Sequence, residues 1–255
     1  MARLRVVLLQ IRPGSFPSRE ERRSLADLAP GLIVLPEYWA VAPGTTSPAR
    51  SFVHFDRSLE ELRSLAVECN TVVVGGTVVE KEGQDYFNSC FVFDRRQLAG
   101  FYRKIHVTER ERAAGMTPGR DHRVLQVGPI RIGLLICADV LVPASFDAMR
   151  AERAHIIAVP TSSPYRPDDT LDAKERRDRE IFVAGAARAS AFVVKTCAAG
   201  ALLGAPLQGR SLVAGPAGVL ARVPFGDEDR EARMVVDLDL DAVTATDGHL
   251  ASHGV

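Results

Sequence analysis

Two kinds of segment alternate along the chain. Short runs rich in Val, Ile and Leu are typical of strands, and longer stretches with apolar residues three or four apart are typical of helices. Gly and Pro separate these segments. The apolar runs predict strands over residues 4–11, 32–35, 71–79, 88–94, 124–127, 130–136, 156–159, 192–196, 211–214 and 234–238. The helical spacing predicts helices over residues 19–28, 55–69, 142–153 and 168–189.

The order of these segments indicates an α/β protein. The run 130–136 is apolar almost throughout, as expected for a strand that is covered on both faces of its sheet. No Pro- or Ser-rich linker, low-complexity tract or long internal repeat divides the chain. We therefore expect one domain over residues 1–255.

The charge and composition of the chain argue against some classes of binding partner. The chain has 32 Lys plus Arg against 32 Asp plus Glu, so it offers no basic surface for nucleic acid or for an anionic membrane. It contains no run of about 18 apolar residues, and Arg12-Pro13 interrupts the first apolar run. We expect a cytoplasmic protein with a small-molecule partner, without a membrane segment or a signal peptide.

The cysteines and histidines give no sign of a metal site. The four cysteines are far apart and form no Cys-x-x-Cys pair, which argues against a zinc ribbon or a disulfide scaffold. His249 and His253 are four residues apart but have no third ligand nearby. The segment 204–211 has P-loop spacing without the lysine, and a strand rather than a helix follows it. No metal and no cofactor are therefore predicted.

Two cysteines are candidate nucleophiles. Cys137 ends the apolar run 132–136, and Cys197 ends the run 192–196. The carboxyl end of a buried strand is where open α/β sheets place catalytic groups. A small apolar residue filling a strand end gives the same pattern, and position alone does not separate the two cysteines.

Two charged residues are candidates for proton transfer and charge stabilisation. Glu37 follows the run 32–35 beside Tyr38 and Trp39, so it is expected to be partly desolvated, as suits a general base. Lys104 lies among apolar residues, and a buried ammonium needs an anion to face. The alternatives are an ordinary polar residue leaving a strand and a solvated lysine on a strand edge.

In chain order, Leu-Pro-Glu37, Tyr-Arg-Lys104-Ile-His and Leu-Ile-Cys137-Ala-Asp resemble the motifs of the nitrilase superfamily of carbon–nitrogen hydrolases, in its amidase-like branch. Further landmarks of the family extend over nearly the whole chain. The resemblance implies a four-layer α-β-β-α sandwich and a Glu-Lys-Cys triad of these three residues. It favours Cys137 over Cys197, because relatives commonly have Asn at the second position.

The resemblance also implies an activity. It indicates a cysteine-dependent hydrolase of non-peptide linear amides that forms a thioester acyl-enzyme, releases ammonia or an amine and uses no cofactor. Lys104 is expected to lower the pKa of the thiol and, with the backbone N–H of Ala138, to stabilise the oxyanion. Glu111 is preferred over Glu109 as an accessory glutamate, and Thr161 is a candidate substrate contact.

Alternatives remain open within and outside this chemistry. The runner-up activities are an N-carbamoyl amidohydrolase and a nitrilase. The segment 138–143 is interpreted as lacking the aromatic and acidic neighbours of the nucleophile in true nitrilases, which favours amides. A catalytically inactive scaffold that binds a metabolite or partner is the alternative from another class.

The resemblance further implies a homodimer or higher homo-oligomer. The predicted helix 142–153 carries Phe146 and Met149 three residues apart. These two side chains are expected to pack either on a partner subunit or simply on the chain's own sheet.

Overall fold

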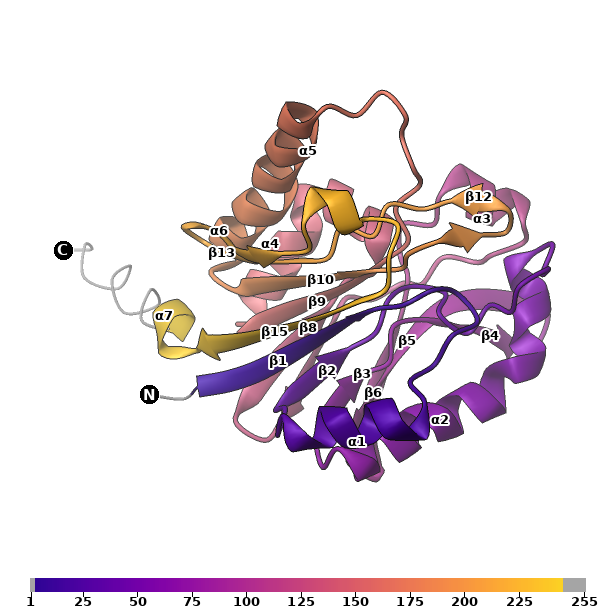
Figure 1. Ribbon diagram of the computed structural model, residues 1–255, viewed down its shortest axis with the longest axis horizontal. Coiled ribbons are helices and arrows are strands. Elements are labelled where there is room, and N and C mark those ends of the chain that lie inside the picture. Colours follow the sequence, from indigo (N-terminus) through magenta and orange to yellow (C-terminus); the bar gives the residue numbers. More distant parts are fainter. Residues whose placement is uncertain (1–2, 245–255) are drawn as a thin grey trace.

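Two β-sheets lie face to face in the computed structural model, which describes residues 3–244 (Figure 1). The first sheet has the order β15 (Ala232–Asp239), β1 (Arg3–Gln10), β2 (Leu32–Val34), β3 (Val72–Val74), β5 (Asp85–Asp94) and β4 (Val78–Glu82), with β6 (Gln97–Arg103) also paired to β5. The second has the order β14 (Gly218–Arg222), β13 (Leu212–Gly215), β10 (Phe192–Cys197), β9 (Ile156–Thr161), β8 (Ile130–Leu134) and β7 (Arg123–Val127). β11 (Ala201–Leu202) and β12 (Ala205–Pro206) form a separate hairpin.

Both sheets have a parallel centre with antiparallel flanks. β1, β2 and β3 run parallel in the first sheet, and β8, β9 and β10 run parallel in the second. The strands outside these two groups pair antiparallel. The parallel centres bring the carboxyl ends of several strands to one edge of each sheet.

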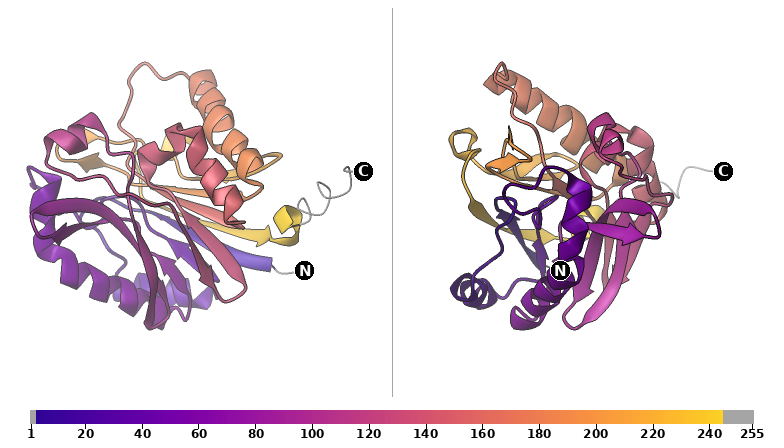
Figure 2. Two further views of the ribbon diagram at one scale, coloured as in Figure 1. Left: turned by 180° about the vertical axis from the view of Figure 1, so that it is seen from behind. Right: turned by 90° about the vertical axis from the view of Figure 1, so that its right-hand side faces the viewer.

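Helices cover the outer faces of the two sheets (Figures 1 and 2). The α-helices are α1 (Arg19–Asp27), α2 (Phe55–Glu68), α3 (Glu109–Ala113), α4 (Pro143–Ala151), α5 (Leu171–Arg177), α6 (Ala184–Ala189) and α7 (Asp241–Thr244). Shorter turns of 3-10 helix span Pro48–His54, Cys137–Leu141 and Phe225–Asp227, and a π-helical segment spans Asp178–Val183. No helix within residues 3–244 is long and apolar enough to cross a membrane.

The alternation of side chains along β1 explains the layers. Val6 and Leu8 point into the core between the two sheets, whereas Val7 and Leu9 point outward to the core under α1 and α2. Successive side chains of a strand face opposite sides, so a strand covered on both faces must be apolar at nearly every position. The apolar runs of the sequence are a consequence of this four-layer α-β-β-α sandwich.

The outer layer on the second sheet depends on close packing of α4. Phe146 and Met149 of α4 are buried in the core that this helix forms with α6 and the sheet. A Cβ on Gly133 would lie 2.4 Å from the Met149 sulfur, and one on Gly185 would lie 2.3 Å from the Phe146 ring, so glycine is needed at both positions. These two side chains therefore pack on their own sheet and not on a partner.

The predicted strand 71–79 is wrong at its centre, because Gly75 and Gly76 divide it into β3 and β4. Gly76 has a φ of +57°, and a Cβ there would lie 2.0 Å from the Pro36 carbonyl oxygen. The close approach of these chain segments fixes the loop that carries Glu37. β6, β14 and α3 were not predicted, and the predicted helix 168–189 begins at Leu171 and widens into the π-helical segment at Asp178.

Candidate active site

Three chain segments from the two sheets bring Glu37, Lys104 and Cys137 to one end of the sandwich. Glu37 follows β2 and Lys104 follows β6 in the first sheet, whereas Cys137 follows β8 in the second sheet. Lys104 Nζ donates a hydrogen bond of 2.8 Å to Glu37 Oε1. Both side chains are only 1% exposed, so this ion pair is shielded from solvent.

Cys137 lies at a sharp turn. It begins the 3-10 helix Cys137–Leu141 and has a φ of +46°, a left-handed conformation that is unfavourable for a residue with a side chain. It is partly exposed, whereas Cys69, Cys90 and Cys197 are buried. Of the four cysteines, Cys137 is therefore the one whose residue is not buried.

A second carboxylate completes the surroundings of Lys104. Glu111 accepts hydrogen bonds from Lys104 Nζ at 2.9 Å and 2.8 Å, one on each of its oxygens. Glu111 also accepts from the backbone N–H of Thr108 at 2.8 Å, within a capping box that starts α3. Glu109 lies exposed on the same helix. The helix cap thus directs Glu111, and not Glu109, towards Lys104.

Both oxygens of Glu37 are occupied by donors. Oε1 accepts from Lys104 and from Asn88 Nδ2, the latter at 2.9 Å. Oε2 accepts from the backbone N–H of Ser162 at 2.9 Å and from its hydroxyl at 2.5 Å. Asn88 also donates to Glu111 at 3.0 Å, and Tyr38 donates to Glu111 at 2.7 Å. The two carboxylates are therefore held by one continuous hydrogen-bond network.

Asp139 fixes the turn at Cys137 from the other side. This carboxylate is fully buried and accepts from the backbone N–H of Ile136 at 2.8 Å and from the Tyr102 hydroxyl at 2.7 Å. It also accepts from the backbone N–H of His106 at 2.8 Å and lies 2.9 Å from His106 Nδ1. The interpretation that the segment after Cys137 lacks an acidic neighbour is wrong, because Asp139 is such a residue.

The charges of the cluster shift the pKa of Lys104 and the pKa of Glu111 in directions that can be explained. Burial alone would lower the pKa of Lys104, but Glu37, the sulfur of Cys137 and Glu111 raise it above its usual value. Burial alone would raise the pKa of Glu111, but the Lys104 ammonium and hydrogen bonds from Lys104, Thr108 and Tyr38 hold it below its usual value. Lys104 is thus a permanent cation and Glu111 a permanent anion near neutral pH.

The pKa of the Cys137 thiol differs from the expectation. Burial and the negative charge of Glu37 raise the pKa of Cys137, and the lowering effect of Lys104 does not compensate for them. The ammonium does lower the pKa, as expected, but the expected net depression is not found because burial, the largest effect, outweighs it. A thiol in this setting keeps its proton at neutral pH and needs a base to remove it.

Ala138 and Thr161 are each adjacent in the chain to a residue of the network. Ala138 follows Cys137 inside the same 3-10 helix. Thr161 is buried at the end of β9, where its hydroxyl donates to the Val159 carbonyl at 3.0 Å. The neighbouring Ser162, rather than Thr161, contacts Glu37 in the structure. Cys197 is buried.

Sequence reasoning missed four polar residues of the network: Tyr38, Asn88, Asp139 and Ser162. A signal was present for two of them. Asn88 interrupts an apolar strand and Asp139 follows the candidate nucleophile by two residues, and a buried polar group in such a position requires a partner. Ser162 had no comparable signal, because it stands in an ordinary polar loop after β9.

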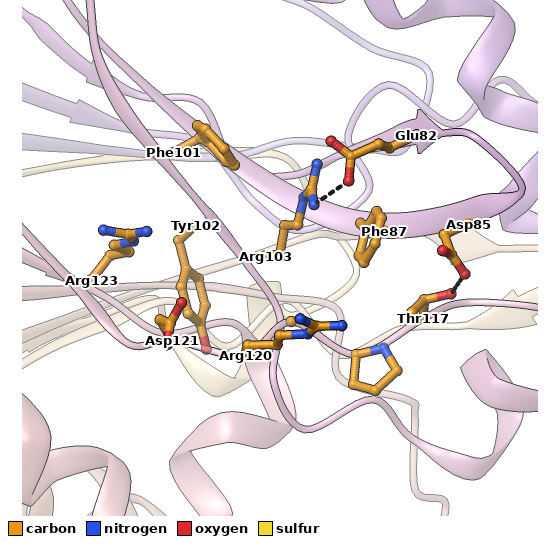
Figure 3. A pocket seen from close by; sticks show the side chains of 12 residues that line it. Glu82, Asp85, Phe87, Phe101, Tyr102, Arg103, Thr117, Arg120, Asp121 and Arg123 are labelled. Atoms are coloured by element: carbon orange, nitrogen blue, oxygen red, sulfur yellow. Dashed lines mark hydrogen bonds and ion pairs between the residues drawn. The ribbon is translucent and has the colours of Figure 1, made fainter.

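A separate pocket of about 520 Å³ lies along β6 (Figure 3). Its lining includes Phe87, Arg103 and Arg120 but none of Glu37, Lys104 and Cys137. Arg103 stacks on Phe87 at 4.0 Å and donates to Glu80 and Glu82, so its charge is compensated. The Gly119 N–H at the edge of this pocket donates to the Lys104 carbonyl at 2.7 Å, so this wall supports the backbone that carries Lys104.

Nothing in residues 3–244 resembles a metal site. No group of three or more His, Cys, Asp or Glu side chains in this part of the chain is arranged to hold an ion. His249 and His253 lie outside the described residues.

The four-layer sandwich carries Glu37, Lys104 and Cys137 at one end. The chain belongs to the carbon–nitrogen hydrolase family, whose model matches residues 23–247.

Individual relatives agree with this family. A nitrilase of Pyrococcus abyssi is 33% identical over 108 residues, which cover 42% of this chain and 41% of that protein. An (R)-stereoselective amidase of Pseudomonas sp is 29% identical over 191 residues, which cover 74% of this chain and 65% of that protein. The matches span less than two thirds of the length of either relative. The crystal structure of a carbon–nitrogen hydrolase from Helicobacter pylori G27 superimposes with a TM-score of 0.82 at 20% identity, covering 98% of this chain and 94% of that chain.

Proposed function

We propose that this protein is an amidase that hydrolyses non-peptide linear amides through a thioester on Cys137. The observation that carries the proposal is the buried contact of 2.8 Å between Lys104 and Glu37, with the strained, partly exposed Cys137 adjoining it. Relatives of the same family include both an amidase and a nitrilase, so the family alone leaves the substrate open.

In the first half of the reaction, the Cys137 sulfur attacks the amide carbon while its proton passes to Glu37. The raised pKa of this thiol makes the base necessary, because little thiolate is present beforehand. The oxygen of the amide then carries negative charge. Collapse of this intermediate breaks the C–N bond, and Glu37 returns the proton to the departing nitrogen.

Lys104 and the backbone N–H of Ala138 are the proposed donors to the oxyanion. Lys104 makes three contacts, of which two go to the same carboxylate, Glu111. One N–H can therefore turn to the substrate while the ammonium stays bound to Glu111. Donors held in place by a buried network need little reorganisation when the charge develops, which is the condition for effective stabilisation of the transition state.

In the second half, water attacks the thioester and Glu37 removes a proton from that water. The sulfur leaves and the acid is released. Amides are favoured over nitriles because an amide passes through a tetrahedral oxyanion, the species that Lys104 and Ala138 suit. A nitrile passes through a thioimidate, which develops no such oxygen charge. Because Asp139 is an acidic neighbour of Cys137, the lack of such a neighbour can no longer be used as an argument against nitriles. The preference for amides therefore rests on the oxygen charge that only the amide reaction develops.

A panel of matched amides, nitriles and N-carbamoyl compounds, scored by ammonia and carbon dioxide release, tests the proposal. We expect ammonia from amides with a higher kcat/KM than from the matching nitriles. Carbon dioxide released together with ammonia would indicate the N-carbamoyl activity instead. No turnover of any class by the folded protein would favour an inactive binding scaffold.

A homodimer and a cytoplasmic location stay predictions. Phe146 and Met149, which were candidate contacts with a partner, are buried inside the chain's own core. A dimer would therefore use other surface residues. Light scattering at micromolar concentration tests this prediction, and a monomeric mass with full activity would overturn it.

A further inference from the structure

Ser162 holds the general base of the proposed reaction, because it supplies both donors to one oxygen of Glu37. Its backbone N–H donates to Glu37 Oε2 at 2.9 Å, and its hydroxyl donates to the same oxygen at 2.5 Å. A general base acts efficiently only when it is oriented towards the proton that it takes. The position of Ser162 therefore affects the orientation of the Glu37 carboxylate.

Ser162 lies where a fixed strand passes into a loop. Before it, Thr161 ends β9, pairs with Cys197 and accepts a hydrogen bond of 2.9 Å from the backbone N–H of Ala198. From Ser162 onwards, residues 162–170 form the loop that leads to α5 (Figure 1). Surface loops open more readily than strands, so the position of Ser162 depends on what binds this loop.

A short stretch of backbone before β13 binds the loop from one side. The Gln208 N–H donates to the Ser163 carbonyl at 2.9 Å, and the Tyr165 N–H donates to the Pro206 carbonyl at 2.9 Å. Pro164 lies between these two contacts, in an antiparallel bridge. The pairing does not use the Pro164 carbonyl, which leaves this oxygen for another donor.

The side chain of Gln208 is that donor. Its Nε2 donates to the Pro164 carbonyl at 3.0 Å and makes a longer contact of 3.4 Å with Asp169 Oδ2. Gln208 is only 1% exposed, and its own carbonyl accepts from the Arg210 N–H at 3.0 Å. Arg210 is held by a buried ion pair of 2.8 Å with Asp178. One buried amide thus fastens the loop to a fixed part of the fold.

Stability alone does not explain the amide of Gln208. Its oxygen Oε1 is buried and has no hydrogen-bond partner within residues 3–244. A buried acceptor without a partner is unfavourable, and an apolar side chain of similar shape would avoid this penalty. Polar groups that are buried at the expense of stability are expected at functional positions.

We propose that Gln208 is a positioning residue that holds Ser162 against Glu37, an inference that rests on the proposed function of this site. The amide binds the carbonyl of Pro164, two residues after Ser162, and so fixes the first residues of the loop. No hydrogen bond joins Gln208 to the three predicted triad residues in the described part of the chain. Its effect on the reaction therefore passes through the loop.

Gln208→Met tests this role, because methionine has nearly the same length but no amide. Loss of the unpartnered oxygen should keep the Tm within about 3 °C of the wild type. The kcat should fall by about tenfold, with a change in KM of about twofold or less, because a small displacement of Ser162 disturbs the chemical step. Gln126→Met is the matched control and should keep the wild-type kcat, since Gln126 Nε2 also donates to a backbone carbonyl, but in the exposed turn between β7 and β8.

Gln208→Asn covers the case in which Gln208→Met does not fold. It keeps an amide but is shorter by one CH₂, which weakens the contact with Pro164, so it should lower kcat in the same way. In either variant chymotrypsin should cleave after Tyr165, which is 51% exposed, faster than in the wild type, because the loop is released. An unchanged rate of cleavage would overturn the role of Gln208.

A double-mutant cycle separates positioning through Ser162 from a general structural effect. Ser162→Ala removes the shorter of the two contacts with Glu37 and should lower kcat by about tenfold. In the Ser162→Ala background, Gln208→Met should lower kcat by only about threefold, because the contact that it disturbs is already lost. An equal loss in both backgrounds would make the role of Gln208 merely structural, and a wild-type kcat in Gln208→Met would also overturn the proposal.

Alkylation of Cys137 by iodoacetamide near neutral pH repeats the cycle without hydrolysis of an amide. Glu37 takes the proton of the thiol in the proposed reaction, so both single variants should slow the labelling, and their effects should again be less than multiplicative. This result in a folded protein that hydrolyses no amide would support the role of Gln208 and refute the amidase. Multiplicative effects in a protein with amidase activity would refute only the role of Gln208.

Discussion

The Tyr102 hydroxyl donates a hydrogen bond of 2.7 Å to the Asp139 carboxylate, and this contact joins the two sheets beside Cys137. Tyr102 belongs to β6, two residues before Lys104, and Asp139 stands two residues after Cys137. The same carboxylate holds the backbone N–H of Ile136, at the start of the strained turn. The relative positions of the ammonium and the thiol therefore depend on one buried acid.

Tyr102→Phe should weaken both stability and activity. It removes one donor from a fully buried carboxylate, which should lower the free energy of unfolding by about 1.5–3 kcal/mol. A looser turn at Cys137 should lower kcat by about tenfold, with a smaller change in KM. Urea denaturation and steady-state kinetics measure the two effects. Tyr86→Phe on β5 is the matched control, and an equal loss of kcat in both variants would remove the special role of Tyr102.

Glu111→Gln should lower kcat by about 10²-fold or more, because it weakens the hold on Lys104 and removes a charge from the network. Glu109→Gln is the matched control on the same helix, and it should have kinetics like those of the wild type because Glu109 is exposed. The reverse outcome, with loss confined to Glu109→Gln, would make Glu109 the accessory glutamate.

The lowered pKa of Glu111 also predicts how stability depends on pH. A carboxyl group with a lower pKa in the folded state than in the unfolded state stabilises the fold above its unfolded value of about 4.3, and this contribution is lost as pH falls through the folded value. The unfolding free energy of the wild type should therefore fall more steeply below pH 4.3 than that of Glu111→Gln. Urea denaturation at pH 7, 5 and 3 gives the unfolding free energy of both proteins. An equal fall with pH in the wild type and in Glu111→Gln would contradict the lowered pKa of Glu111.

The apolar runs predicted strands that are covered on both faces, and the family resemblance implied the four-layer sandwich that the structure has. The sequence also predicted Glu37, Lys104 and Cys137 as members of one site, and the structure brings the first two within 2.8 Å. It did not predict the raised pKa of Cys137, because burial of the thiol, which is the main cause, is set by the fold. Ser162 was missed for a similar reason: a serine in a polar loop gives no signal until the fold places it against Glu37.

Boundaries were harder to predict where glycine or a π-helical turn changes the path of the chain. The split between β3 and β4 at Gly75 and Gly76 depends on contact with Pro36, which is distant in the sequence. α3 is too short for a periodic pattern, so its capping residues Thr108 and Glu111 were the only local signal.

Lys104→Ala should abolish turnover, with kcat reduced by about 10³-fold or more, because it removes a proposed oxyanion donor. It also leaves Glu37 and Glu111 facing each other without their shared cation, which should cost about 3–5 kcal/mol of stability at pH 7. This cost should shrink as the pH falls, because protonation removes the buried negative charge. Lys81→Ala, at an exposed position on β4, is the control for loss of a lysine in the same sheet. Near-normal kcat in a folded Lys104→Ala protein would exclude Lys104 from the chemistry.

Brief treatment with iodoacetamide should place the label on Cys137 alone. Cys137 is the partly exposed cysteine, whereas Cys69, Cys90 and Cys197 are buried. Peptide mass spectrometry measures the labelled fraction of Cys137, and activity should fall in proportion to that fraction. Because the pKa of Cys137 is raised, the rate of labelling should still increase from pH 7 to pH 9, whereas a preformed thiolate would give a flat profile over that range. Cys137→Ser should remove the label and Cys69→Ser should retain it. Inactivation that follows a label on Cys197 would assign the nucleophile to the other cysteine.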